Sequence, residues 1–260
     1  MPKIDSVWLQ WINENLLRSC NKKDLFEILL KNDFEFEDII THLSKSYKCD
    51  YCSINNILKN HTNSEKIQTD KVDIYKVDNF LNEYECDELL LNLCNESFFK
   101  STITTDITEI DKKFRTSTTC YLNNFNTVYN NLDNKICEFI GIEKERSEHV
   151  QGQKYKVGQE FKLHTDYFSE TPDNNKFLSN GGQRTWTFMI YLNNVEEGGS
   201  TNFPLIDIDI LPKKGSALIW YNLDSNQNCN EYSKHSGTPI IKGEKYILTK
   251  WFRKGKTNYY

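Results

Sequence analysis

Two side chains that can bind a metal ion lie one residue apart in the segment FKLHTDYF, residues 161–168. His164 and Asp166 flank Thr165, and several of their neighbours are of the aromatic and branched types that favour β-strands. Because alternate side chains of a strand face the same way, His164 and Asp166 are expected to project together and to grip one metal ion. The same pair also fits a structural hydrogen bond, so a third ligand is needed to decide.

His235, in the segment YSKHSGTPIIKGEKYILTKWF, is the candidate for that third ligand. Two imidazoles and one carboxylate form the facial triad of non-haem Fe(II) oxygenases, which leaves three coordination positions open. The other histidines, His42, His61 and His149, lie in helical or polar parts of the sequence that offer no comparable setting. The sequence therefore points to one metal site made of two histidines and one aspartate.

Lys245 opens a strand-like segment in which Ile247, Thr249 and Trp251 would share its face. A lysine that points into a β-barrel is costly unless an anion pairs with its ammonium group. One interpretation is an ion pair with a carboxylate of a bound diacid. The alternative is a surface lysine at the start of a strand, which is the commoner position for this residue type.

Short β-type segments, separated by Gly, Pro and Asn, follow one another from Tyr155 onward. Frequent strands without intervening helices are typical of an antiparallel sandwich or barrel and not of a parallel α/β sheet. Upstream, a strand is expected over residues 72–77, followed by two helices, one in NEYECDELLLNLCNES and one in NTVYNNLDNKICEFIG. The candidate ligands therefore lie in a β-rich domain.

Helical periodicity covers residues 5–59, where three short helices are expected. Residues 59–70 are polar and without periodicity, which is typical of a linker. We therefore expect a helical N-terminal module with its linker at residues 1–69 and the β-rich domain at residues 70–260. The module would pack on that domain or bind a protein partner.

The chain of 260 residues carries 32 Lys and Arg against 37 Asp and Glu, a formal net charge of −5, and no basic block. This balance argues against nucleic acid or an anionic membrane surface as the main partner. No run of about 18 apolar residues and no signal-peptide pattern stands out, so a cytoplasmic protein is expected. The abundance of Asn, Lys, Ile and Tyr suggests an AT-rich genome, such as that of a large DNA virus.

Several ordered motifs between about residue 72 and residue 253 resemble the 2-oxoglutarate and Fe(II)-dependent dioxygenases of the prolyl 4-hydroxylase group. The motifs are NFLNEYECDELL, RTSTTCYL, YKVGQEFKLHTDYF, GGQRTWTFMIYLNNVEEGGSTNFP, LPKKGSALIWYN and HSGTPIIKGEKYILTKWFR. The resemblance implies a double-stranded β-helix core of the jelly-roll or cupin-like type. The expected fold class is therefore mainly β with flanking helices and a small N-terminal helical segment.

The resemblance also implies roles for single residues. His164, Asp166 and His235 match the Fe(II) ligands, and Lys245 matches the partner of the distal carboxylate of 2-oxoglutarate. The other matches are two hydroxyl side chains that help to hold this carboxylate, an aromatic residue near the metal, and two arginines that face the peptide substrate: Tyr155, Thr201, Trp251, Arg115 and Arg184. Arg115 also fits a structural salt bridge.

One position departs from the family pattern. The family often has Tyr three residues before the first histidine ligand, where this chain has Phe161. A hydroxyl close to the substrate is thereby lost, which changes the expected substrate pose and leaves the metal ligands intact.

Residues around the site are expected to exclude water, since such chemistry needs a dry and shaped cavity. Trp186, Phe188, Ile190 and Trp251 are compatible with this lining, although the same residues would fill any β core. The long polar segment 169–182 is expected to be a loop over the substrate channel, or a solvent loop without a role.

The implied function is hydroxylation of prolyl residues in a peptide or protein, coupled to the decarboxylation of 2-oxoglutarate to succinate. Fe(II), O2 and ascorbate as reductant are the implied cofactors, and a proline-containing peptide or protein is the expected partner. Two alternatives stay open: an oxygenase that acts on another side chain or a small molecule, and a non-catalytic β-helix domain that binds a protein. An inward-facing lysine argues against the second alternative, because a binding-only domain has no need for it.

Overall fold

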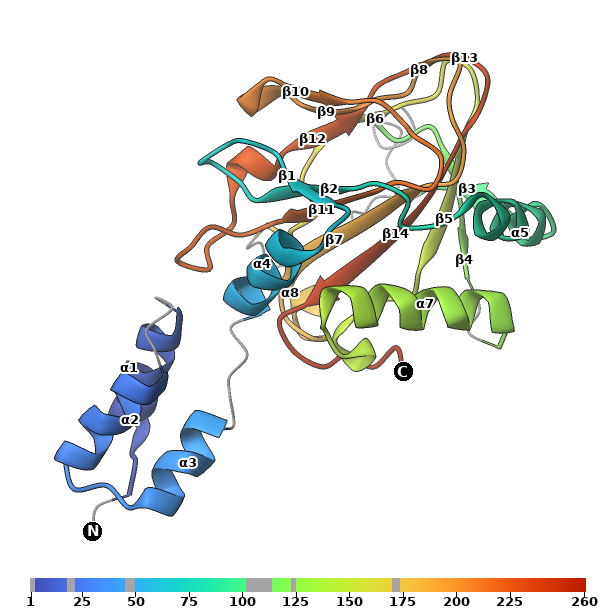
Figure 1. The fold of residues 1–260 in the computed structure, drawn as a ribbon. Coiled ribbons are helices and arrows are strands. Elements are labelled where there is room, and N and C mark those ends of the chain that lie inside the picture. Colours follow the sequence, from blue (N-terminus) through green and yellow to red (C-terminus); the bar gives the residue numbers. More distant parts are fainter. Residues whose placement is uncertain (1–2, 18–21, 45–49, 102–113, 123–124, 170–173) are drawn as a thin grey trace. The chain divides into compact units, whose positions relative to one another are not determined.

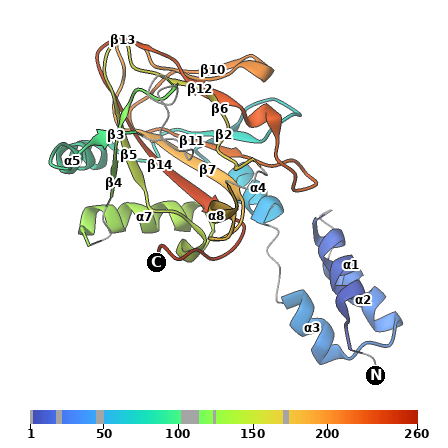
Figure 2. The same cartoon turned by 180° about the vertical axis from the view of Figure 1, so that it is seen from behind.

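The computed structural model describes residues 3–17, 22–44, 50–101, 114–122, 125–169 and 174–260. The chain divides into two compact units, Met1–Ile57 and Leu58–Tyr260. Figures 1 and 2 show the ribbon from two opposite sides. The helices of the first unit and the sheets of the second each have a core of their own.

The first unit contains the three expected helices, α1 (Ser6–Leu17), α2 (Lys22–Lys31) and α3 (Phe36–Ser44). Their apolar stripes meet in one core, whose fully buried members include Ile12, Leu29 and Ile39. A fourth helix, α4 (Asp50–Asn60), follows, where the sequence had indicated only three.

The main sheet of the second unit has eight strands among the described residues, in the order β1-β2-β11-β7-β14-β5-β4-β3, and every pairing is antiparallel. In this order the strands span Ser64–Lys66, Ile74–Val77, Ala217–Tyr221, Arg184–Tyr191, Lys245–Arg253, Gln151–Tyr155, Thr118–Tyr121 and Phe99–Lys100.

A smaller antiparallel sheet has the order β10-β9-β12-β6, and β8 pairs with β13. These strands span Ile208–Ile210, Thr201–Phe203, His235–Gly237, Phe161–His164, Glu197–Gly198 and Ile240–Lys242. Apolar side chains from both sheets share one core, including Tyr191 and Leu218 of the main sheet and Phe203 of the smaller one. Two facing antiparallel sheets with few helices confirm the mainly β class that the sequence predicted.

Two longer helices, α5 (Glu83–Cys94) and α7 (Thr127–Ile140), cover the main sheet on the side away from the smaller sheet (Figures 1 and 2). A Cβ added at Gly152 of β5 would lie 2.5 Å from Leu93 of α5, so the helix packs directly on the strand. Both helices begin at asparagine caps, and Asn82 forms a capping box with Glu85. A short helix, α8 (Asn175–Leu178), precedes β7.

The segment expected to be a linker, residues 59–70, contains β1, which pairs with β2 at the edge of the main sheet. Its residues, Ser64, Glu65 and Lys66, are all polar and none is fully buried. An edge strand of this kind carries no apolar alternation, so periodicity could not reveal it. None of the described helices combines the length and the apolar character needed to cross a membrane.

A buried ion pair joins α7 to β14. Lys250 Nζ lies 2.5 Å from Asp133 Oδ1, and both side chains are fully buried. Lys250 Nζ also donates to the carbonyl oxygen of Glu148 at 2.9 Å. Because side chains alternate along a strand and Lys250 faces the helices, its two neighbours, Thr249 and Trp251, face the smaller sheet.

We expect Lys250→Met to lower the free energy of unfolding by about 3 kcal/mol, because the buried Asp133 Oδ1 loses its partner and the carboxylate keeps only Lys144, 3.0 Å from Oδ2, as counter-charge. Urea unfolding of the full chain measures this loss. Lys242→Met is the matched control, since Lys242 pairs with Glu196 at the exposed surface and such pairs contribute about 1 kcal/mol or less. Equal losses in the two variants would contradict the expectation.

Candidate metal centre

The three candidate ligands meet where the smaller sheet faces the main sheet. His164 is the last residue of β6 and His235 the first of β12, and the two are direct partners in the sheet. Asp166 lies in a bend just after β6. The ligand atoms of the three residues lie within 4.8 Å of one another. The predicted proximity of His164 and Asp166 is therefore seen, although the bend, and not strand alternation, produces it.

Both histidines present the same ring nitrogen to the common centre. Nδ1 of His164 lies 2.7 Å from the carbonyl oxygen of Lys162, and Nδ1 of His235 lies 2.9 Å from that of Ser233. Since a carbonyl can only accept, Nδ1 carries a proton in each ring, which leaves Nε2 as the atom that can bind a metal ion. The two Nε2 atoms each lie 3.9 Å from a carboxylate oxygen of Asp166.

The protonation states suit metal binding. Burial lowers the pKa of His164 to about 3, so its ring is neutral near pH 7. Burial works against ionisation of Asp166, but His235, His164 and Arg184, together with a hydrogen bond from Thr187, lower the pKa of its carboxyl group. Two imidazoles and one carboxylate form the donor set that non-haem Fe(II) prefers, so the residues fit this ion.

Thr187 of β7 fixes the carboxylate of Asp166. Its Oγ1 donates to Asp166 Oδ2 at 2.7 Å and accepts from Nδ2 of the fully buried Asn222 at 2.9 Å. Hydrogen bonds to ligand atoms from behind orient them for the metal. The main sheet thus positions a ligand that belongs to the loop after the smaller sheet.

A cavity extends from the three candidate ligands to Lys245, which is buried and only 3% exposed. Its Nζ donates to the carbonyl oxygen of Gly199 at 2.6 Å and lies within 6 Å of the ring centres of Tyr155 and Tyr191. Burial lowers the pKa of this ammonium group to about 7, while Asp209 opposes the shift. Among the described residues no carboxylate forms an ion pair with it, so the pocket suits an anionic ligand.

This cavity, the smaller of two next to the candidate ligands, connects Lys245 to the triad. Tyr155 and Thr201 line it as expected, and Thr201 Oγ1 lies 2.7 Å from the hydroxyl of Tyr191. The predicted shared face of the last strand is confirmed, since four alternate residues of β14 line this cavity: Lys245, Ile247, Thr249 and Trp251.

The prediction of which β7 residues line the cavity is wrong: the lining residue lies on the opposite face of the strand from the predicted ones. Met189 lines the smaller cavity, because it lies opposite Thr249 in the register with β14. Trp186, Phe188 and Ile190 line neither cavity, and Phe188 instead contacts the ring of Phe139 in α7. The prediction chose the bulky residues of β7. Because this strand is buried on both faces, the size of a side chain does not show which face it lies on.

A larger cavity of about 790 Å³ opens on the other side of His164 and Asp166. Both predicted substrate arginines and Trp251 line it. Aromatic rings dominate the wall: Phe114, Tyr121, Phe161, Tyr167, Phe168, Phe177, Trp251 and Tyr259. The segment 169–182 contributes Ser169, Asn174, Lys176 and Phe177, while residues 170–173 lie outside the described part of the chain.

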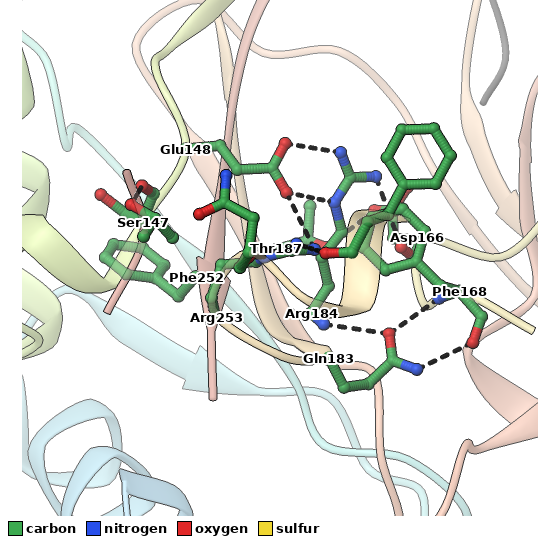
Figure 3. A network of polar contacts seen from close by, with 12 residues as sticks. Ser147, Glu148, Asp166, Phe168, Gln183, Arg184, Thr187, Phe252 and Arg253 are labelled. Atoms are coloured by element: carbon green, nitrogen blue, oxygen red, sulfur yellow. Dashed lines mark hydrogen bonds and ion pairs between the residues drawn. The ribbon is translucent and has the colours of Figure 1, made fainter. Parts of the chain in front are cut away.

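Arg184 is held between Glu148 and the backbone of Asp166, as Figure 3 shows. Its guanidinium group makes two hydrogen bonds to the Glu148 carboxylate, at 2.6 and 2.7 Å, and lies 4.1 Å from the ring centre of Trp251. Arg115 is buried and donates to Ser117 Oγ at 3.3 Å. Both arginines are therefore fixed parts of the cavity wall.

Phe161, which stands where the family often has Tyr, stacks on a candidate ligand. Its ring centre lies 3.5 Å from that of His164, with 15° between the planes, and the guanidinium group of Arg115 lies 4.7 Å from the same ring. The ring thus supports the imidazole by packing alone.

The structure adds residues that the sequence reasoning missed, chiefly Thr187, Tyr191 and Glu148. Thr187 and Tyr191 share the inward face of β7 with Met189, so a correct assignment of that face would have found them. Glu148 offered no such signal, because its role depends on a partner 36 residues away along the chain.

A family model described as the 2OG-Fe(II) oxygenase superfamily matches residues 150–253. Among curated relatives, "Probable prolyl 4-hydroxylase 8" of Arabidopsis thaliana is 34% identical over 196 residues, covering 67% of this chain and 66% of that protein. "Putative prolyl 4-hydroxylase" of Acanthamoeba polyphaga mimivirus is 32% identical over 184 residues, covering 70% of this chain and 74% of that protein. The chain thus spans just under two thirds of the first relative and nearly three quarters of the second.

A solved structure extends the match to the fold. The viral collagen prolyl hydroxylase from Paramecium Bursaria Chlorella virus-1, in its 2-oxoglutarate complex, is 28% identical, with a TM-score of 0.52 over 69% of this chain and 95% of that chain. The resemblance inferred from the motifs, the double-stranded β-helix fold, and Fe(II) with 2-oxoglutarate as cofactors are thereby confirmed. The chain belongs to the prolyl 4-hydroxylase family of 2-oxoglutarate- and Fe(II)-dependent oxygenases.

Proposed function

We propose that this protein hydroxylates prolyl residues of a peptide or protein. In the balanced reaction, 2-oxoglutarate, O2 and a C–H bond of the substrate yield succinate, CO2 and a C–OH group. One observation carries the proposal: the His-Asp-His group lies between a cavity that ends at a buried lysine and a larger, aromatic-lined cavity. The names of the matched relatives and of the viral structure support prolyl residues as the target.

His164, Asp166 and His235 would hold Fe(II) through Nε2, a carboxylate oxygen and Nε2, respectively. Lys245 would pair with the distal carboxylate of 2-oxoglutarate, and the hydroxyls of Tyr155 and Thr201 would donate to its oxygens. Tyr191, whose hydroxyl lies 2.7 Å from Thr201 Oγ1, would orient the Thr201 hydroxyl by donating to it. When bound, the iron and 2-oxoglutarate together supply, with O2, an oxidant strong enough to break an unactivated C–H bond. The chain's own task is to place that bond correctly and to keep water away.

The larger cavity suits an extended, proline-rich segment. Grooves lined by aromatic side chains bind polyproline II segments, whose rings pack on flat aromatic surfaces. Trp251 and Phe161 line both cavities, so a proline ring held there would lie next to the metal ligands. Arg184 and Arg115 would then fix the peptide on either side of the target residue.

The test is succinate formation by purified protein with Fe(II), ascorbate and O2, with and without proline-rich peptides. We expect peptide-dependent succinate together with a peptide mass gain of one oxygen atom. His235→Ala should abolish both, whereas His42→Ala, in the first unit, should change neither. Succinate without peptide stimulation would redirect the search to another substrate, and an inactive iron-loaded protein would favour the non-catalytic alternative.

Thr187→Val should weaken metal binding about 10- to 100-fold, because the carboxylate of Asp166 loses the hydrogen bond that orients it. Calorimetric titration of the metal-free protein with Mn(II) measures the dissociation constant. Thr185→Val serves as control, since Thr185 is also buried on β7 but, among the described residues, its hydroxyl bonds only to the backbone oxygen of Phe252. Identical affinities in the two variants would contradict the role given to Thr187.

The affinity for 2-oxoglutarate should fall as pH rises above about 7, by up to about tenfold per pH unit. The sign follows from Lys245, whose pKa is about 7 in the free protein. The carboxylate pairs with the charged form, which is fully present below this pH and is lost above it. Titration of Mn(II)-loaded protein without O2, from about pH 6.5 to about pH 8.5, measures the trend. Lys245→Arg stays charged and should bind with little pH dependence; a flat profile in the unaltered protein would refute the assignment.

A further inference from the structure

We propose that Gln151 and Trp251 bind the backbone of the peptide substrate, with Gln151 accepting a peptide N–H and Trp251 donating to a peptide carbonyl. Gln151 thereby selects substrates in which a residue other than proline lies beside the target proline. The inference rests on the proposed function and deepens it by specifying the class of proline-containing sequence.

The two side chains carry buried polar atoms that lack partners. Gln151 is 9% exposed and Trp251 6% exposed, and both line the larger cavity. Among the described residues, neither Gln151 Oε1 nor Trp251 Nε1 has a hydrogen-bond partner. Buried polar atoms in folded proteins are nearly always paired, so an acceptor and a donor left open in one cavity point to a ligand that carries both groups.

Other polar groups of the same wall are already engaged. Glu148 takes two hydrogen bonds from Arg184. Arg253 donates to the carbonyl oxygen of Asn180 at 2.6 Å; its Nη1 has no hydrogen-bond partner among the described residues but forms an ion pair with Glu148 Oε1 at 3.4 Å. These groups hold the wall together, whereas Gln151 and Trp251 keep their hydrogen-bonding capacity for the substrate.

The sheet register places the two side chains together. Gln151 of β5 lies opposite Thr249 of β14, and Trp251 follows Thr249 by two residues, so both side chains leave the same face of the main sheet. Lys245 lies opposite Tyr155 at the other end of the same two strands. The pair of strands β5 and β14 therefore carries Lys245 at one end, and the unpaired donor of Trp251 and acceptor of Gln151 at the other.

The chemistry of the peptide backbone gives the selection. Every residue offers a carbonyl oxygen, so Trp251 can be satisfied by any sequence, including polyproline. Proline has no N–H, so the unpaired acceptor Oε1 of Gln151 can be satisfied only by a residue of another type. A polyproline segment would bury the acceptor of Gln151 without a partner, and this costs affinity.

The experiment compares three peptides of equal length: alternating Ala-Pro, the same peptide with N-methylalanine in place of alanine, and polyproline. Two quantities are measured, kcat/KM for peptide hydroxylation and the peptide dissociation constant with Mn(II) and 2-oxoglutarate in the absence of O2. We expect the alternating peptide to have a kcat/KM about tenfold higher, and a dissociation constant about tenfold lower, than either of the other two peptides.

Variants of Gln151 distinguish the loss of a hydrogen bond from a steric effect of the N-methyl group. Gln151→Met keeps the length of the side chain and removes the acceptor, so the preference for Ala-Pro should fall to about twofold or less. Gln151→Glu keeps an acceptor and should retain the preference. Trp251→Phe should weaken the binding of all three peptides by the same factor. Gln68→Met, outside both cavities, should behave as the unaltered protein.

The ratio between peptides is a readout that general damage to the fold would not change selectively. Persistence of the tenfold preference in Gln151→Met would overturn the inference, as would equal use of the three peptides by the unaltered protein. Collapse of the preference in Gln151→Met with its retention in Gln151→Glu supports it. If no proline peptide is bound or hydroxylated, the proposed function itself fails and the inference fails with it.

Discussion

The register of β14 between β5 and β7 is the constraint on which the site depends. It puts Lys245, Thr249 and Trp251 on the face toward the smaller sheet and Lys250 on the face toward α7. A slip by one residue would exchange these faces and would turn the diacid partner toward the helices. The many backbone hydrogen bonds of the longest strand thus fix the chemistry as well as the fold.

The metal centre depends on both sheets at once. The histidines come from β6 and β12 of the smaller sheet, while Thr187 of the main sheet holds the carboxylate between them. Neither sheet alone supplies a fixed triad, so the site exists only when the two pack together. The aromatic stack of Phe161 on His164 adds apolar support at the open side, where the larger cavity begins.

Much of the site could be predicted because its residues are chemically unusual in their places. Two histidines and an aspartate in β-rich segments suggested a metal-ligand set by residue type, and the resemblance of the ordered motifs to a known family assigned the role of Lys245. The face of β7 was not predictable in the same way, because Thr187 and Phe188 are both buried and neither direction shows in the pattern. Likewise β1 is too short and polar for periodicity, and the pairing of Arg184 with Glu148 depends on long-range contact.

The ion pair between Lys250 and Asp133, on the helix side of the main sheet, affects how the wall of the larger cavity can move. Lys250 holds the backbone oxygen of Glu148, whose side chain holds Arg184 in the larger cavity. The part of the wall that carries Glu148 and Arg184 is therefore tied to the buried core, and we expect it not to open as a separate local unit. Its backbone amides should exchange with solvent only through global unfolding, so this part of the enzyme should recognise its substrate as a rigid template and not by closing around it.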